Sequence, residues 1–207
     1  MKLTWHGHSC FTIRTAQGSV CVDPYADNYI PGYGAIRPEA DAVFCSHGHN
    51  DHGNAAAVRL SGNPCGVGVE TISTFHDEVQ GAKRGPNLIH IFSAEGMKVV
   101  HLGDLGCELE AEQAAALTGA DVLLIPVGGF YTIDAAQAAA LVEQLRPRVV
   151  VPMHYRGEGF GYEVIGPVDD FLALCKGTVK VLDSNEFEIT PDTPAQTVVP
   201  KFDLTLF

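Results

Sequence analysis

His47-Gly48-His49-Asn50-Asp51-His52 is the stretch of sequence around which the chain is organised. It places three imidazoles and one carboxylate within six residues. The apolar run before it, residues 41–46, predicts a buried strand, and residues 55–60 after it predict a short helix. The motif is therefore expected in a loop that connects a strand to a helix.

The spacing of these side chains favours metal binding. In an extended loop, residues two apart face the same way, so His47 and His49 can bind one cation together. Asp51 and His52 then turn toward a neighbouring point. Imidazole nitrogens and carboxylate oxygens suit zinc and other borderline divalent metals. A polar turn with solvated histidines is the alternative, but four ligand side chains in six positions form a dense motif.

The composition describes one globular domain. The chain has 207 residues, of which 46% are hydrophobic, and no apolar run approaches the roughly 18 residues that span a membrane. Residues 1–5 predict a strand, so no secretory or transit peptide is expected. The scattered cysteines form no C-x-x-C pair, which favours reduced thiols and a cytoplasmic location. They are Cys10, Cys21, Cys45, Cys65, Cys107 and Cys175.

The charge limits the partners. The net charge is −12 and there is no basic tract, so binding to nucleic-acid backbones is not expected. A nuclease is not excluded by charge alone, because bound metals make a cleft positive. The expected partner is a small molecule.

The predicted elements change character along the chain. The first half favours short antiparallel strands at 3–5, 10–14, 20–23 and 66–75, with a hairpin of 87–92 and 97–102. The second half alternates strands with helices: helices at 108–117, 134–145 and 167–175, strands at 121–126 and 148–152, and a last hairpin of 178–182 with 186–189. Asp134 and Gln137 form a predicted capping box. Sheets packed together with helices outside fit this order.

The loop from Tyr25 to Pro38 has no periodicity and is long for a connection. Its apolar residues Tyr25, Tyr29, Ile30 and Tyr33 could line a substrate cleft. They could equally pack over the core.

Further motifs occur over nearly the whole chain. They are Trp5-His-Gly-His-Ser-Cys-Phe11, Asp23-Pro24, His76-Asp-Glu78, Arg84-Gly-Pro-Asn87, His101-Leu-Gly-Asp-Leu-Gly106, Pro126-Val-Gly-Gly129 and Pro152-Met-His-Tyr155. With the H-x-H-x-D-H signature, the chain resembles the metallo-β-lactamase-fold hydrolases. It is most similar to the compact branch of Zn-dependent or metal-dependent hydrolases distantly related to ascorbate-6-phosphate lactonase. This resemblance implies an α+β fold, the four-layer αββα sandwich, formed by a single domain at 1–190 and followed by a tail at 191–207.

The resemblance also implies a dinuclear site at one rim of the sheets. Carried over to this sequence, the first metal binds His47, His49 and His76. The second metal binds Asp51, His52 and His154, and Asp104 bridges the two. The implied cofactors are two divalent ions, zinc in the first place, with manganese or iron as alternatives. Such ions activate water for attack on a carbonyl or phosphoryl centre. Asp51 and His8 are the expected catalytic residues.

Other polar residues have secondary roles in this prediction. Asp23 is a candidate acceptor for the outer N–H of a ligating imidazole, with a surface position as the alternative. His6, His90 and His101 are interpreted as structural. Cys107 stands where many relatives have a histidine, so substrate specificity could differ here.

The leading hypothesis is a metal-dependent hydrolase of a small ester, lactone or phosphoester. The alternatives are a phosphodiesterase or nuclease, a diiron redox protein, and a non-catalytic binding module. The diiron relatives resemble H-x-E-x-D, with a carboxylate where this chain has His49, so His49 favours hydrolysis.

Two segments carry additional hypotheses. Phe202, Leu204 and Leu206 alternate with polar residues, so the tail could pack on a neighbouring copy in a homo-oligomer, or fold back on its own domain. Arg84 could bind an anionic group of the substrate, or pair internally with Asp77 or Glu78.

Overall fold

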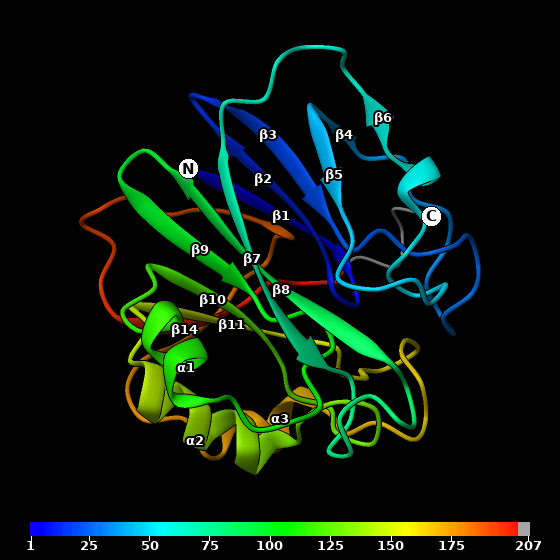
Figure 1. The fold of residues 1–207 in the computed structure, drawn as a ribbon, viewed down its shortest axis with the longest axis vertical. Coiled ribbons are helices and arrows are strands. Elements are labelled where there is room, and N and C mark those ends of the chain that lie inside the picture. Colours follow the sequence, from blue (N-terminus) through cyan, green and yellow to red (C-terminus); the bar gives the residue numbers. More distant parts are fainter. Residues whose placement is uncertain (203–207) are drawn as a thin grey trace.

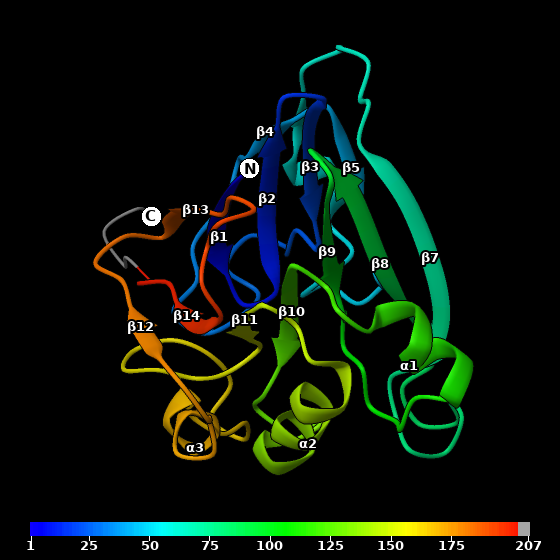
Figure 2. The same cartoon turned by 90° about the vertical axis from the view of Figure 1, so that its left-hand side faces the viewer.

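The computed structural model describes residues 1–202, and the N-terminal strands form most of a five-stranded sheet (Figures 1 and 2). Its order is β13-β1-β2-β3-β5. These strands span Glu186–Glu188, Lys2–Gly7, Cys10–Thr15, Gly18–Val22 and Ala42–Phe44, respectively. β1, β2 and β3 are antiparallel, whereas β5 runs parallel to β3. β5 leads into the 47–52 motif.

The second sheet has seven strands in the order β12-β14-β11-β10-β9-β8-β7. They span Val179–Val181, Gln196–Val199, Val149–Met153, Val122–Pro126, Met97–His101, Pro86–Ala94 and Gly68–Phe75, respectively. β7, β8 and β9 are antiparallel, and the strands from β9 to β12 are parallel. Every residue of β10 and β11 is buried, as expected for parallel strands covered on both faces. A small third sheet pairs β4 (Glu39–Ala40) with β6 (Arg59–Leu60).

Three α-helices lie together on one side of the molecule, beside the seven-stranded sheet (Figures 1 and 2). They are α1 (Ala111–Leu117), α2 (Ala135–Leu145) and α3 (Val168–Leu172). The predicted capping box starts α2: the Gln137 N–H donates to Asp134 Oδ1 at 2.9 Å, and the Asp134 N–H donates to Gln137 Oε1 at 3.0 Å. Within residues 1–202, no helix is long and apolar enough to cross a membrane.

The two large sheets share the main hydrophobic core. Alternate residues of the second strand, Phe11 and Ile13, belong to this core together with Phe92 and Val99 of the larger sheet. The side chain of Cys10 points to the opposite face of the smaller sheet, because successive side chains of a strand alternate between its two faces. Two sheets packed face to face, with helices outside the larger one, confirm the predicted α+β sandwich.

The outer face of the five-stranded sheet is covered by the loop at 24–38 and the 3₁₀ helix η1 (Ala55–Ala57). Tyr25, Ile30 and Tyr33 are buried there, so they pack over the core and do not line a cleft. Of the four apolar residues predicted to line a cleft or pack over the core, Tyr29 alone is exposed. On this face, a loop and one turn of 3₁₀ helix replace the helical layer that the four-layer prediction expected. The predicted helix at 55–60 is correspondingly short, because β6 begins at Arg59.

The predicted hairpin of 178–182 with 186–189 is wrong. β12 pairs with β14 in the larger sheet, whereas β13 pairs with β1 in the smaller one. The turn residue Asn185 explains the separation: its carbonyl accepts the Trp5 N–H at 2.8 Å, and its Nδ2 donates to the Trp5 carbonyl at 3.0 Å. These bonds to β1 carry the chain from one sheet to the other.

The described part of the predicted tail, residues 191–202, folds onto its own domain. β14 lies between β11 and β12, and its Val198 and Val199 are buried. The ring of Phe202 packs against Trp5 and Tyr33, with centroids 5.6 and 4.6 Å away. Leu204 and Leu206 lie outside the described residues. A homo-oligomer stays a prediction.

Replacing Val198 by alanine should lower the free energy of unfolding by about 2 kcal/mol, because two buried methyl groups are lost and a cavity remains. Val181→Ala on the neighbouring β12 is the matched control. Val181 is 69% exposed, so the same change should stay within about 0.5 kcal/mol. Urea denaturation of both variants measures the difference, and equal stabilities would contradict an integral β14.

Candidate metal centre

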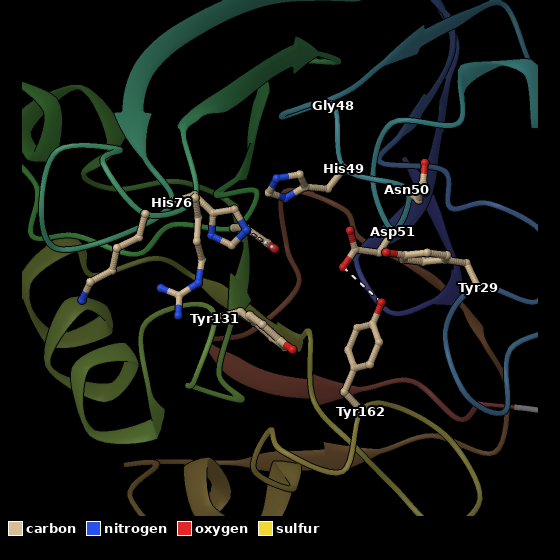
Figure 3. Close-up of a pocket in the computed structure, with 11 residues that line it drawn as sticks. Tyr29, Gly48, His49, Asn50, Asp51, His76, Tyr131 and Tyr162 are labelled. Carbon is tan, nitrogen blue, oxygen red and sulfur yellow. Dashed lines mark hydrogen bonds and ion pairs between the residues drawn. The ribbon is translucent and has the colours of Figure 1, made fainter.

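The seven predicted ligands all follow strand ends. His47, His49, Asp51 and His52 lie in the loop after β5, whereas His76, Asp104 and His154 follow β7, β9 and β11. β5 belongs to the smaller sheet and the other three strands to the larger one, so the site lies at an edge that both sheets share. Figure 3 shows His49, Asp51 and His76 directed into one pocket.

The side chains form three groups, two of which match the predicted sets. Ligand atoms of His47, His49 and His76 lie within 4.8 Å of one another. A second group within the same limit contains Asp51, His52 and His154, together with His8. A third group, His47, His52 and Asp104, takes one histidine from each of the other two. The structure therefore brings all seven predicted ligands together, and it adds His8 to the second group.

Asp104 lies between the two groups. Its Oδ2 is 3.2 Å from His76 Nε2, 3.3 Å from His154 Nε2 and 4.0 Å from His47 Nε2. Its Oδ1 is 3.0 Å from His52 Nε2. Burial alone would raise the pKa of Asp104, but the imidazoles of His154 and His52 hold it well below its usual range. An ionised carboxylate thus occupies the position predicted for the bridging ligand.

Asn87 fixes the backbone that carries Asp104. Its Oδ1 accepts the Asp104 N–H at 2.9 Å, and its Nδ2 donates to the Leu102 carbonyl at 3.0 Å. Gly103 lies between these two contacts at φ +57°, and a Cβ there would be 2.3 Å from Asn87 Oδ1. Only glycine fits that position without displacing the amide.

Asp23 orients His52 from behind. The His52 Nδ1–H donates to Asp23 Oδ2 at 2.7 Å, which directs Nε2 toward Asp104. The Ser46 backbone N–H and hydroxyl also donate to Asp23, at 2.6 and 2.7 Å. Although burial raises the pKa of Asp23, His52 and His101 lower it to about 2. Asp23 is fully buried, so the alternative of a surface carboxylate is wrong.

His8 faces the site, as expected. Its ring centroid is 4.1 Å from that of His154, and its Nε2 is 3.7 Å from Asp51 Oδ2. Burial, followed by the neighbouring His154, lowers the pKa of His8 to about 4, so the imidazole is neutral at pH 7. His8, Asp23 and His154 all have φ between +50° and +54°, a region that non-glycine residues seldom adopt. Such backbone strain concentrates at functional sites.

The donor set fits divalent cations. Several buried atoms of the site have no hydrogen-bond partner within the described chain: both ring nitrogens of His8, Nε2 of His47, His52 and His154, and Oδ1 of Asp104. Buried polar atoms without partners are costly. Imidazole nitrogens and carboxylate oxygens that converge in this way have the chemistry of a zinc-type site.

The remaining histidines and Cys107 lie outside these groups. His6 contacts Thr12 Oγ1 at 2.7 Å, and His101 Nε2 contacts the Ser9 carbonyl at 2.9 Å. His90 is buried between the sheets beside Phe92. These positions agree with structural roles. Among residues 1–202, Cys107 belongs to no potential metal-binding group.

A pocket of about 500 Å³ opens in front of the site. It is lined by Tyr29, Gly48, His49, Asn50, Asp51, His76, Lys83, Arg84, Asp104, Tyr131 and Tyr162 (Figure 3). The Tyr162 hydroxyl donates to Asp51 Oδ2 at 3.5 Å. Tyr131 and Tyr162 were not predicted as site residues. Tyr131 follows Gly128-Gly129 just after a predicted strand end, which is the signal that could have indicated it, whereas Tyr162 lies farther along its loop and has no such signal.

The loop at 76–86 forms one wall of the pocket and is folded around Asp77. The two carboxylate oxygens of Asp77 accept the backbone N–H groups of Val79, Gly81, Lys83 and Arg84 at 2.7–3.0 Å. The Lys83 ammonium pairs with Glu78. The guanidinium of Arg84 pairs with neither acid, so the internal pair predicted as its alternative role is wrong.

Comparison with known proteins agrees with the fold. Residues 2–154 match the β-lactamase superfamily domain. The chain belongs to the metallo-β-lactamase superfamily and is a metal-dependent hydrolase.

Individual relatives are similar over most of their length. A UPF0173 metal-dependent hydrolase of Thermoplasma acidophilum is 30% identical over 191 residues, covering 75% of this chain and 83% of the relative. A crystal structure from Thermotoga maritima is also similar, and its protein is assigned to the Zn-dependent hydrolases of the superfamily. The two proteins superpose with a TM-score of 0.73 at 33% sequence identity, and the match covers 96% of this chain and 97% of the Thermotoga chain. A metallo hydrolase from Ignicoccus hospitalis shares the fold at 24% identity, with a TM-score of 0.59 over 91% of this chain and 99% of its own.

Asn87→Ala should lower the free energy of unfolding by about 3 kcal/mol, because it leaves the buried Asp104 N–H and Leu102 carbonyl unpaired. It should also weaken zinc binding by about 10- to 100-fold, since Asp104 loses its support. Urea denaturation and competition with a chelator measure the two effects. Gln144→Ala on the exposed face of α2 is the control and should change neither. Unaltered zinc affinity in Asn87→Ala would show that Asn87 does not position Asp104.

Proposed function

We propose that the chain hydrolyses a small ester, lactone or phosphoester with a dinuclear metal site. His47, His49 and His76 would hold one ion, and Asp51, His52 and His154 would hold the other. Asp104 would contact both. The observation that carries this proposal is the position of Asp104, whose carboxylate lies within 3.0–4.0 Å of imidazole nitrogens from both groups.

When bound, the ions supply activated water and offset the negative charge that develops on the attacked group. The protein residues supply position and proton transfer. Asp51 accepts a contact from Tyr162 and lies 3.7 Å from His8, so its carboxylate is held on the pocket side of the site. There it can take a proton from the attacking water and return it to the leaving oxygen. The reaction adds the elements of water across the scissile bond.

Zinc is the proposed metal. All seven proposed ligands and the neighbouring His8 offer imidazole or carboxylate donors of the kind that zinc prefers, with no thiolate among them. The similar protein from Thermotoga maritima is described as Zn-dependent. His49 stands where the diiron pattern has a carboxylate, which favours hydrolysis over redox chemistry. The six cysteines are free thiols, and we propose a cytoplasmic location, where thiols remain reduced.

Metal analysis tests the dinuclear assignment. Zinc-saturated wild-type protein should contain about two ions per chain by elemental analysis. Asp51→Ala should keep about one and lose more than about 100-fold in hydrolytic rate, because a ligand and a proton acceptor are removed together.

Asp192→Ala, which removes an exposed carboxylate far from the motif, is the control and should retain both ions. Circular dichroism establishes that each variant is folded. A content of one ion or fewer in the wild type would refute the two-metal site.

A further inference from the structure

Arg84 is the pocket residue whose role is unexplained by the metal centre. Its Nη2 donates to the Phe130 carbonyl at 3.0 Å, and its Cζ lies 5.6 Å from the centre of the Tyr131 ring. Arg37 and Arg148 differ, because they pair with Asp27 and Asp121. Within the described residues, Arg84 has no carboxylate at ion-pair distance, and the N–H groups other than that on Nη2 have no protein acceptor.

The guanidinium is held in place before any ligand arrives. The Asp77 carboxylate accepts the Arg84 backbone N–H at 2.7 Å, which fixes the start of the side chain. Phe130 and the Tyr131 ring fix its end, the latter by a cation–π contact. Phe130 itself has φ +61°, so the carbonyl that accepts Arg84 is presented by an uncommon backbone conformation. A side chain ordered in advance loses little conformational entropy when it binds.

The location of Arg84 is unusual for so acidic a chain. The net charge is −12, yet Lys83 and Arg84 both line the pocket. The Lys83 ammonium is neutralised by Glu78, which leaves Arg84 as the open positive group on this wall. A planar guanidinium with free N–H groups matches the oxygens of a carboxylate or a phosphate.

Tyr131 sets the distance between this group and the metal centre. Its ring centroid is 6.5 Å from that of His154, while its other neighbour is the Arg84 guanidinium. One aromatic ring therefore separates Arg84 from a proposed metal ligand. The pocket of about 500 Å³ admits a small molecule. One that reaches both groups must span this ring, so its anionic group lies several bonds from the bond that is cleaved.

We propose that Arg84 forms an anion-binding subsite and that the substrate is a small ester, lactone or phosphoester with a second, remote carboxylate or phosphate group. The inference rests on the proposed hydrolysis for the identity of the cleaved bond, but the subsite itself depends only on Arg84 and its neighbours. The remote anion binds the guanidinium and is unchanged by the reaction.

A binding experiment with zinc-loaded protein tests the subsite without turnover. Linear six-carbon hydroxamic acids, which bind zinc through the hydroxamate, are compared by calorimetry with three tails: a carboxylate, a phosphonate and a neutral carboxamide. The wild type should bind the better anionic tail about 10- to 100-fold more tightly than the carboxamide, the range for a charged hydrogen bond. Whichever anion is preferred identifies the group that the substrate carries.

Arg84→Ala should abolish this preference and leave carboxamide binding unchanged. Arg84→Gln keeps a donor for the Phe130 carbonyl and should also abolish the preference for the anionic tail. It replaces the alanine variant in the experiment if that variant folds poorly. Lys83→Ala and Arg59→Ala each remove one positive charge, from the same loop and from the exposed β6, respectively. Both should retain the preference.

No preference in the wild type, or a preference that survives in Arg84→Gln, would overturn the subsite. An equal loss of the anion preference in Lys83→Ala would also overturn the subsite, because it would show that the anion is attracted by the overall positive charge and not by a specific contact with Arg84. Hydrolysis of the matching 4-nitrophenyl esters is measured separately. Tail-dependent binding without ester, lactone or phosphoester hydrolysis would contradict the proposed function and leave the subsite intact.

Discussion

The attraction between one buried carboxylate and the imidazoles around it is the interaction on which the site depends. An isolated carboxylate in a protein interior is strongly unfavourable, and removing a partner from a buried charge is costly. Asp104 is 1% exposed and has imidazoles from three separate segments within 4.0 Å. Those segments follow strands of both sheets. The same contacts that stabilise the charge therefore hold the edges of the two sheets together.

The site divides into a rigid part and a variable part. The proposed metal ligands follow strands and are supported from behind by buried groups such as Asp23 and Asn87. The pocket wall in front of them comes from loops that carry Tyr29, Arg84 and Tyr162. Loops tolerate change better than the strands that they connect, so the pocket wall can change without disturbing the proposed ligands.

The sequence predicted the side chains that converge in the candidate metal centre better than it predicted those that line the pocket. His47, His49, Asp51 and His52 are close in sequence, so their spacing alone indicated a joint role. His76, Asp104 and His154 could be assigned through local motifs that the family shares. Tyr131 and Tyr162 have no such motif, because their proximity to Asp51 and His154 results from how loops pack in three dimensions.

The fold, too, was predictable from local sequence patterns but not where it depends on packing between distant segments. Patterns of period two and 3.6 indicated most strands and helices, including the capping box at Asp134. They indicated strand pairing only in part: the predicted hairpin of 87–92 with 97–102 is confirmed, because β8 pairs with β9. Residues 178–189 have the pattern of a hairpin, yet the bonds between Asn185 and Trp5 carry the second strand to the other sheet. The loop at 24–38 likewise gave no sign of which tyrosines are buried, since burial there depends on the distant sheet face that the loop covers.

The turn around Asp77 connects a proposed metal ligand, His76, with the proposed anion-binding residue, Arg84. His76 precedes the turn and Arg84 closes it. The Asp77 carboxylate accepts the Arg84 backbone N–H at 2.7 Å, and the His76 backbone N–H donates to the Gly85 carbonyl at 3.1 Å, so the two ends of the turn are joined. Whatever orders one end of this turn also orders the other. For the proposed anion at Arg84 and the proposed cation at His76, thermodynamic linkage makes any coupling reciprocal: each changes the other's affinity by the same factor. The loop would thus make metal retention sensitive to the supply of substrate.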